Sequence, residues 1–129
     1  MLVDDNARFR ALLRQLLERD PEIAVVAEAS SGAQALGLAA EHAPDVVVMD
    51  VSMPELDGVR ATAALKGRTP ETSVLMLSVD QGDRELAASL SRGASEYLLK
   101  GGPAHEIVSA IKRHGRVAGN ATPSPSGPA

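Results

Sequence analysis

The chain has 129 residues, enough for one domain, of which 44% are hydrophobic and 2% aromatic. The absence of cysteine excludes disulfides, zinc–thiolate sites and a cysteine nucleophile, and the scarcity of aromatic rings argues against a base-stacking nucleic-acid platform and against flavin or haem pockets. The chain has 17 Asp and Glu residues and 13 Lys and Arg residues, which gives a formal net charge of −4. This negative charge opposes binding to the phosphate backbone of a nucleic acid.

Apolar runs alternate with segments of helical periodicity five times along the chain, a pattern typical of βα units that build a parallel sheet. The expected strands are short apolar runs, and in chain order they cover residues 2–3, 23–28, 45–50, 73–78 and 95–99. Residues 46–49 are Val-Val-Val-Met, which is too apolar for a half-exposed strand. This run indicates a central strand that is covered by helices on both faces.

A helix is expected after each strand. Apolar residues at i, i+3, i+4, i+7 and i+8 over residues 9–17 predict the first helix, which ends near Asp20. A capping box of Ser31 and Gln34 predicts the start of the second helix, which runs to about His42. The other three helices are bounded by turn residues, and they are expected to end near Gly67, to cover residues 81–92, and to run from Pro103 to about His114.

The composition changes near the C-terminal end, where residues 117–129 are rich in Pro, Ser, Gly and Ala. Such a segment cannot form a packed core. We therefore expect one folded domain over residues 1–116 and a disordered tail or linker over residues 117–129. Since no run approaches the ~18 apolar residues of a membrane helix and no secretion signal opens the chain, a cytoplasmic location without membrane contact is expected.

Charged or hydroxyl side chains end four of the five expected strands. Asp4 and Asp5 follow the first strand, Asp50 and Ser78 end the third and fourth, and Lys100 follows the fifth. In an open parallel sheet these ends meet along one edge, where ligands bind. Three carboxylates about 4 Å apart repel by roughly 4 kcal/mol per pair at an effective dielectric of 20, so the cluster calls for a cation. Oxygen ligands without His or Cys favour Mg²⁺.

The same edge suits a phosphoryl group. Mg²⁺ held by one or two carboxylates can still accept a phosphoryl oxygen, while Lys100 and Ser78 supply a charge and a hydroxyl to the other oxygens. Asp50 is then a nucleophile that forms an aspartyl phosphate. Each residue also has an ordinary interpretation, such as capping of the first helix by Asp4, Asp5 and Asn6 or turn formation by Ser78. Their combination at four strand ends favours the site.

Four motifs carry a family resemblance: Val3-Asp4-Asp5-Asn6; Val48-Met49-Asp50-Val51-Ser52-Met53-Pro54 with Asp57-Gly58; Ser78; and Tyr97-Leu98-Leu99-Lys100. With them, residues 2 to about 116 resemble receiver domains of two-component response regulators. The turn over 52–58 and the ending over 96–100 look most like the subfamily with a LuxR-type helix-turn-helix output domain. The resemblance implies an α/β, flavodoxin-like or CheY-like three-layer sandwich, with a five-stranded parallel sheet in order 2-1-3-4-5 and five helices.

The resemblance also implies roles at the acidic edge. Asp50 would receive phosphate from a histidine kinase in a Mg²⁺-dependent reaction. Asp5, Asp50 and the backbone carbonyl of Ser52 would bind the metal, and Asp4 would bind it through a water. The chain would be a signalling phosphoacceptor rather than an enzyme, with only self-phosphorylation and self-dephosphorylation chemistry.

A second group of residues is implied to form the switch. Lys100 would pair with the phosphoryl oxygens, Ser78 would move to hydrogen-bond one of them, and Tyr97 would turn inward behind Ser78. Ser52 and Asp80 would tune hydrolysis of the phosphate by steering or shielding water. Phosphorylation would switch a partner surface or a homodimer surface, with DNA reached only through an output domain that lies outside this sequence.

Two features depart from the family pattern. Only Met1, Leu2 and Val3 precede Asp4, fewer than the about five residues that a strand needs to span a sheet. Either the start has been trimmed or misassigned, or the domain is weakened. Branched Val79 follows Ser78 where a small residue is common, and it is expected to narrow access for the phosphoryl group.

Three other functions compete with the phosphoacceptor interpretation. A receiver fold that binds partners without phosphorylation is consistent with the short first strand. An FMN carrier would need a Ser/Thr/Gly-rich loop where Asp4-Asp5-Asn6 stands, together with more aromatic rings. A Mg²⁺ phosphohydrolase with an aspartyl nucleophile would need a second general-acid carboxylate where Ser52 stands.

Overall fold

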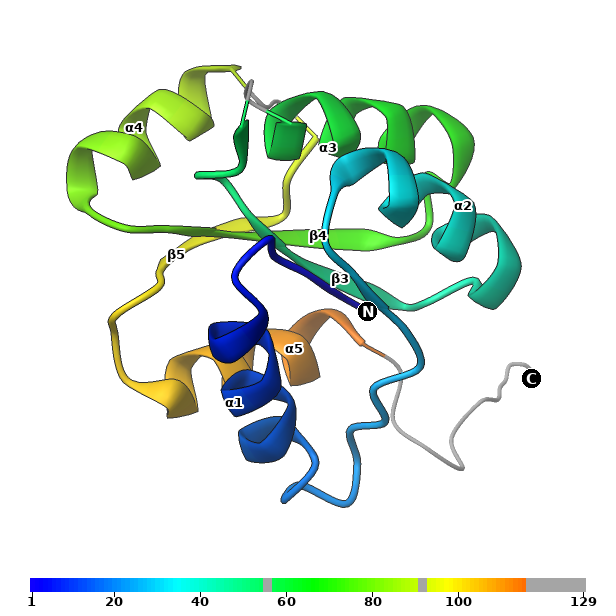
Figure 1. The fold of residues 1–129 in the computed structure, drawn as a ribbon, viewed down its shortest axis with the longest axis vertical. Coiled ribbons are helices and arrows are strands. Elements are labelled where there is room, and N and C mark those ends of the chain that lie inside the picture. The colour runs from blue at the N-terminus through cyan, green and yellow to red at the C-terminus, as the bar shows by residue number, and fades with distance from the viewer. Residues whose placement is uncertain (55–56, 91–92, 116–129) are drawn as a thin grey trace.

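The structure is a computed structural model that describes residues 1–54, 57–90 and 93–115. Strands and helices alternate along these residues (Figure 1), in the order β1 (Leu2–Val3), α1 (Ala7–Leu17), β2 (Glu28–Ala29), α2 (Gly32–His42), β3 (Val46–Asp50), α3 (Asp57–Arg68), β4 (Ser73–Ser78), α4 (Gln81–Leu90), β5 (Glu96–Leu99) and α5 (Ala104–His114). The strands form one five-stranded parallel sheet in the order β2-β1-β3-β4-β5. The predicted three-layer α/β fold with sheet order 2-1-3-4-5 is therefore confirmed.

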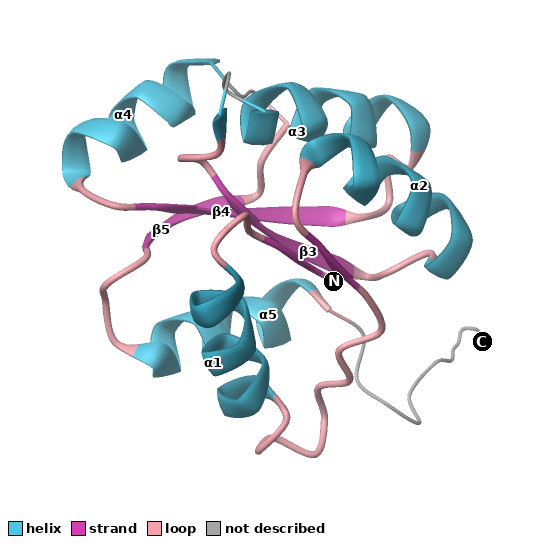
Figure 2. Cartoon of the chain, viewed as in Figure 1, coloured by secondary structure: helices cyan, strands magenta, loops and turns pink. Residues whose placement is uncertain are grey.

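The helices form two layers around the sheet. Figure 2 shows α2, α3 and α4 over one face and α1 and α5 over the other. The central strand β3 is buried along its whole length, as its apolar sequence predicts. Its side chains alternate between the faces: Val47 and Met49 join the core cluster under α2 and α3, whereas Val46 and Val48 join the cluster against α1 and α5.

Helix α1 begins where its sequence supplies a cap. The side chain of Asn6 accepts hydrogen bonds from the backbone N–H groups of Arg8 and Phe9, both at 3.1 Å. These bonds satisfy donors that have no partner inside the helix. The apolar stripe then buries Leu13 and Leu17 against the sheet, whereas Leu12, which was predicted to belong to it, is exposed. The cap and the stripe together direct the first turn of α1 to the carboxyl end of β1.

Most of the capping box that was predicted at the start of α2 is present. The Ser31 hydroxyl accepts a hydrogen bond from the backbone N–H of Gln34 at 3.1 Å. The Gln34 side chain reaches back, although it accepts from the N–H of Ser30 at 2.7 Å rather than from that of Ser31. The helix ends at Ala43, which has a left-handed φ of 46°, and Pro44 follows.

The predicted second strand over residues 23–28 is wrong in its extent, because β2 covers only Glu28–Ala29. This strand lies at the edge of the sheet and pairs with β1 alone, through Leu2↔Glu28 and Val3↔Ala29. Since β1 has two residues, the segment before Glu28 has no strand beside it. Residues 23–27 keep the alternation of half-buried and exposed side chains that belongs to a strand. The hydrogen bond that joins this segment to β1 is made at its last residue, where the Ala27 carbonyl accepts from the Leu2 N–H at 3.1 Å.

A cavity of about 290 Å³ lies beside the start of β1. Met1, residues 22–26, residues 42–46 and the end of α5 line it. The amino group of Met1 donates a hydrogen bond to the Val46 carbonyl oxygen at 2.9 Å at this point. The cavity therefore lies between the segment before β2 and the start of β3, on the side opposite the carboxyl edge of the sheet.

Two expectations concern the rest of the chain. Over the described ranges, none of the helices has both the length and the hydropathy to cross a bilayer. The expected tail, residues 117–129, lies outside the described residues, as do positions 91–92 of the predicted fourth helix.

Candidate functional site

The carboxyl ends of the four strands β1, β3, β4 and β5 bring the predicted polar residues to one edge of the sheet. Asp4 follows β1, and its backbone N–H donates to the Ala29 carbonyl at 3.1 Å. Asp50 and Ser78 are the last residues of β3 and β4. Lys100 follows β5, and its backbone N–H donates to the Ser78 carbonyl at 2.7 Å. Sheet hydrogen bonds thus hold the backbone beneath these side chains.

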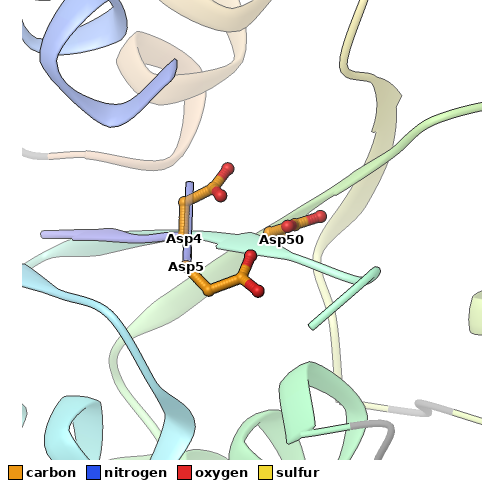
Figure 3. Close-up of side chains that lie close together, drawn as sticks. All are labelled: Asp4, Asp5 and Asp50. Atoms are coloured by element: carbon orange, nitrogen blue, oxygen red, sulfur yellow. The ribbon is translucent and has the colours of Figure 1, made fainter. Parts of the chain in front are cut away.

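Three carboxylates gather at this edge. Asp4, Asp5 and Asp50 each offer an oxygen, and these oxygens lie within 4.8 Å of one another. Figure 3 shows Asp4 and Asp5 leaving the end of β1 in different directions, with Asp50 beside them on β3. Asp4 and Asp50 are 4% and 2% exposed, whereas Asp5 is open to solvent. Two carboxylates of the cluster are therefore buried, and the third is exposed.

The Asp50 carboxylate is held at both oxygens. The backbone N–H of Ser52 donates to Oδ1 at 2.9 Å, and Lys100 Nζ donates to Oδ2 at 3.3 Å. Burial raises the pKa of Asp50 above its ordinary value, and the nearby charge of Asp4 raises it further, while the Ser52 N–H and Lys100 oppose the rise. The charged form of Asp50 is thus short of compensating positive charge in the absence of a cation.

Lys100 lies between two of the carboxylates. Its Nζ is 2.8 Å from Asp4 Oδ2 and 3.3 Å from Asp50 Oδ2, and the side chain is 17% exposed. Burial by itself would lower the pKa of Lys100, but the contact with Asp4 and the charges of Asp50 and Asp4 outweigh it and raise the pKa. Lys100 is therefore a charged ammonium, and it lies nearer to Asp4 than to Asp50.

Asp4 is fixed from several sides. Its Oδ1 accepts a hydrogen bond from the Asn6 N–H at 2.8 Å, and its backbone carbonyl accepts one from Arg10 Nη1 at 2.6 Å. Arg10 also pairs with Glu28 of β2 at 3.0 Å. Asp4 Oδ2 is buried and accepts no well-aligned hydrogen bond from the described residues, although the Lys100 ammonium is close. This oxygen keeps unused acceptor capacity.

Ser78 contributes an isolated hydroxyl. The residue is 1% exposed, and its Oγ has no hydrogen-bond partner in the described part of the chain. A buried hydroxyl without a partner is unfavourable by about 1–3 kcal/mol, so such groups usually have a ligand or a water to bind. The next residue, Val79, is exposed at the surface beside it.

Gly58 explains how α3 begins so close to Asp50. A Cβ atom at this position would overlap the backbone carbonyl oxygen of Asp50. Only glycine lets the two backbones approach this closely without a shift. The sequence motif includes Gly58, but the contact that requires it spans β3 and α3 and is visible only in the structure.

Three of the predicted residues lie outside the charged cluster. Ser52 exposes its side chain and contributes its backbone N–H to Asp50. Asp80 is exposed, and its Oδ1 accepts a hydrogen bond from the Asp83 N–H at 2.9 Å, which is a capping contact at the start of α4. Tyr97 is half-buried on β5 and packs against the core cluster under α2 and α3.

One neighbour of the site is missing from the residues that the sequence singled out. The Lys100 ammonium lies 4.5 Å from the centroid of the Phe9 ring. In the sequence, Phe9 is recognisable only as part of the apolar stripe of α1. Its position in the stripe gives no sign of a contact with a residue that follows β5, because the two are 91 positions apart in the sequence.

Comparisons with known proteins agree with this architecture. The model of the response regulator receiver domain matches residues 1–112. The transcriptional regulatory protein DegU of Brevibacillus brevis is 38% identical over 112 residues, which cover 87% of this chain and 48% of DegU. The response regulator protein VraR of Staphylococcus aureus is 35% identical over 116 residues, covering 90% of this chain and 56% of VraR. The chain thus spans about half the length of these curated relatives.

A solved structure is similar over nearly the same residues. The two-component response regulator of the LuxR family from Aurantimonas sp. SI85-9A1 is 37% identical, with a TM-score of 0.80. The match covers 88% of this chain and 81% of that one.

Proposed function

The chain belongs to the family of response regulator receiver domains, and on this premise we propose that it is a phosphoacceptor that takes phosphate from a histidine kinase onto Asp50. The phosphate switches a surface that binds a partner or a second copy. By analogy with DegU, a transcriptional regulatory protein, the output is control of transcription in the cytoplasm, through a domain beyond the half of DegU that this chain matches.

The observation that carries this proposal is the imbalance of charge at the carboxyl edge. Asp4, Asp5 and Asp50 bring three carboxylates together, and Lys100 is the ammonium between them. The donor set consists of oxygens, and exposed Asp5 leaves room for water ligands. Both features fit Mg²⁺, which prefers carboxylate oxygen and keeps several waters. Asp5, Asp50 and the Ser52 carbonyl would bind the metal, with Asp4 acting through a water.

The residues around Asp50 suit transfer of a phosphoryl group. An oxygen of the Asp50 carboxylate attacks phosphorus, the new O–P bond forms, and the N–P bond of the phosphohistidine breaks as the imidazole leaves with a proton from solvent. Lys100 and the unpartnered Ser78 hydroxyl are the donors for the phosphoryl oxygens. Bound Mg²⁺ would supply further positive charge to those oxygens.

The switch follows from the isolation of the Ser78 hydroxyl. A phosphoryl group on Asp50 offers this hydroxyl an acceptor that the described residues do not provide. Movement of Ser78 toward it vacates space near β4 and β5, into which Tyr97 turns from its half-buried position. Ser52 and Asp80 would tune the lifetime of the phosphate, since each stands two positions after a site residue.

The test is phosphorylation by a small-molecule donor. Incubation with acetyl phosphate and Mg²⁺ is expected to retard the wild-type chain in a phosphate-affinity gel, and Asp50→Asn is expected to abolish the shift. Asp20→Asn is the matched control, because it makes the same chemical change in a carboxylate that pairs with Lys112 on the other side of the molecule. It should behave as the wild type does.

Two outcomes would overturn the proposal. A wild-type chain that stays unmodified in the presence of Mg²⁺ would point to a receiver fold that binds partners without phosphorylation. An equal shift in Asp50→Asn would place the phosphate on another residue. Omitting Mg²⁺ and adding a chelator should abolish the gel shift of each protein that shows one.

A further inference from the structure

The Lys100 ammonium has a third neighbour besides its two carboxylates. Its Nζ lies 4.5 Å from the centroid of the Phe9 ring, inside the ~6 Å range over which the negative face of a ring attracts a cation. The ammonium is therefore bounded by Asp4 at 2.8 Å, by Asp50 at 3.3 Å and by an aromatic face. With its side chain 17% exposed, little of this group remains open to water.

Phe9 is itself held in place. Its backbone N–H donates to the Asn6 side chain at 3.1 Å in the cap of α1. Its half-buried ring packs against the core cluster that lies under α1 and α5, which includes Leu13 and Ile107. The ring is thus part of the scaffold, and the ammonium rests on a fixed surface.

The ring matters because the two carboxylates pull on Lys100 unequally. The ammonium is 0.5 Å closer to Asp4 than to Asp50, so ion pairing alone favours the carboxylate that does not receive phosphate. An aromatic face attracts the cation but accepts no proton and forms no directed bond. It can therefore hold the ammonium close to the site while leaving its N–H groups free to turn from one oxygen to another.

We propose that Phe9 is a positioning residue for Lys100, which holds the ammonium beside Asp50 by a cation–π contact in readiness for the phosphoryl oxygens. The consequence for phosphoryl binding rests on the proposed function of Asp50. The contact itself is independent of that function. A purely structural Phe9 would fill space in the core and have no effect on the site beyond its effect on stability.

The chain offers a sharp test, because Phe9 is its only phenylalanine. Fluorinated phenylalanines therefore alter this ring alone, and successive fluorine atoms weaken the negative face with little change in shape. The series of phenylalanine, 4-fluoro-, 3,5-difluoro- and 3,4,5-trifluorophenylalanine is titrated with beryllium fluoride and Mg²⁺, and the melting temperature of each protein is measured. Phe9→Leu and Phe9→Tyr accompany it as the variants that remove and retain the ring.

Beryllium fluoride affinity is expected to fall stepwise along the series, by about three- to tenfold from the first member to the last, which corresponds to about 0.7–1.4 kcal/mol and lies within the strength of a partly buried cation–π contact. The melting temperature should stay nearly constant. Phe9→Leu should lose affinity to a similar degree, and Phe9→Tyr should recover it. An affinity that is equal across the series, or that follows only the melting temperature, would overturn the proposal.

A second readout separates this inference from the proposed function. The ring current of Phe9 should move the ε-methylene resonances of Lys100 upfield of those of Lys66 and Lys112, and Phe9→Leu should return them to the common position. If wild-type chain binds no beryllium fluoride, the proposed function of Asp50 fails. If the Lys100 resonances do not respond to Phe9→Leu, the cation–π contact fails, whatever the result of the titration.

Discussion

The amino group of Met1 is an ionisable group buried inside the sheet. It donates to the Val46 carbonyl oxygen at 2.9 Å at the edge of the cavity between residues 22–26 and β3. Burial lowers its pKa to about 6, although the nearby charge of Asp45 acts in the opposite direction. The neutral amine is thus favoured in the folded chain, whereas an unfolded chain binds the proton up to its ordinary value of 8.0.

The stability of the chain with a free amino group should therefore rise with pH across this window. Between about pH 6 and pH 8 the unfolded state binds more protons than the folded state, so the free energy of unfolding increases by about 2–3 kcal/mol. Urea unfolding at several pH values measures it. The N-acetylated chain is the control, because its terminal nitrogen does not titrate. It should be more stable than the free chain at pH 6, and its free energy of unfolding should not rise between pH 6 and pH 8 on account of this group. A rise of equal size after acetylation would contradict the assignment to Met1.

At the scale of elements, the length of one strand limits the length of its neighbour. β2 pairs only with β1, and β1 contributes Leu2 and Val3. Residues 23–27 have the alternation of a strand, but they meet β1 only at the Ala27 carbonyl, and a cavity of about 290 Å³ lies beside residues 22–26. An edge strand needs backbone hydrogen bonds from one neighbour, and local β propensity does not replace them.

Extending β1 should restore the missing pairing. A variant with Val-Ile-Val before Met1 has strand-forming residues where the cavity lies, and a Gly-Ser-Gly extension of equal length is the control. We expect the first to protect the amides of residues 24–27 from hydrogen exchange and to raise stability by about 1–3 kcal/mol, from burial of apolar side chains and replacement of the buried ionisable amine by an amide. Equal protection in both variants would show that the added backbone alone suffices, and protection in neither would contradict the explanation.

At the scale of the whole molecule, the charge that the site needs on Asp50 lowers the stability of the metal-free fold. The pKa of Asp50 is raised, chiefly by burial, so the stability that this carboxyl contributes is present at low pH and is lost as pH rises through the raised value. At neutral pH the metal-free protein therefore carries a charged group that the interior disfavours. A divalent cation bound only by the folded state would offset this penalty.

Asp50→Asn should make the metal-free protein more stable at neutral pH, with a melting temperature about 2–6 °C above that of the wild type. Mg²⁺ should then stabilise the wild type, by about 2.7 kcal/mol at 100 times its dissociation constant, and should have little effect on the variant. Calorimetry with and without Mg²⁺ measures both effects. Asp20→Asn neutralises the half-buried partner of Lys112 and should respond to Mg²⁺ as the wild type does. A metal-free Asp50→Asn protein that melts below the wild type would contradict the prediction that burial of the charged carboxylate destabilises the fold.

Much of the fold was predictable because its determinants are local. The apolar run of β3, the stripe of α1 and the caps at Asn6 and Ser31 are patterns within a few residues, and the structure contains each of them. The positions of Asp4, Asp50, Ser78 and Lys100 at strand ends were predictable for the same reason, and the structure brings them to one edge. Their chemical roles stay predictions.

Sequence alone therefore determined the order of elements, the parallel sheet and which side chains reach its carboxyl edge, since these follow from short-range periodicity and from the motifs of the family. Tertiary structure decided the extent of β2, the burial of the Met1 amino group, the isolation of Ser78 and the contact of Lys100 with Phe9. Each of these depends on what a distant segment provides as a partner. Hydrogen bonding, burial and charge act through space, and the distances that set them exist only once the chain has folded.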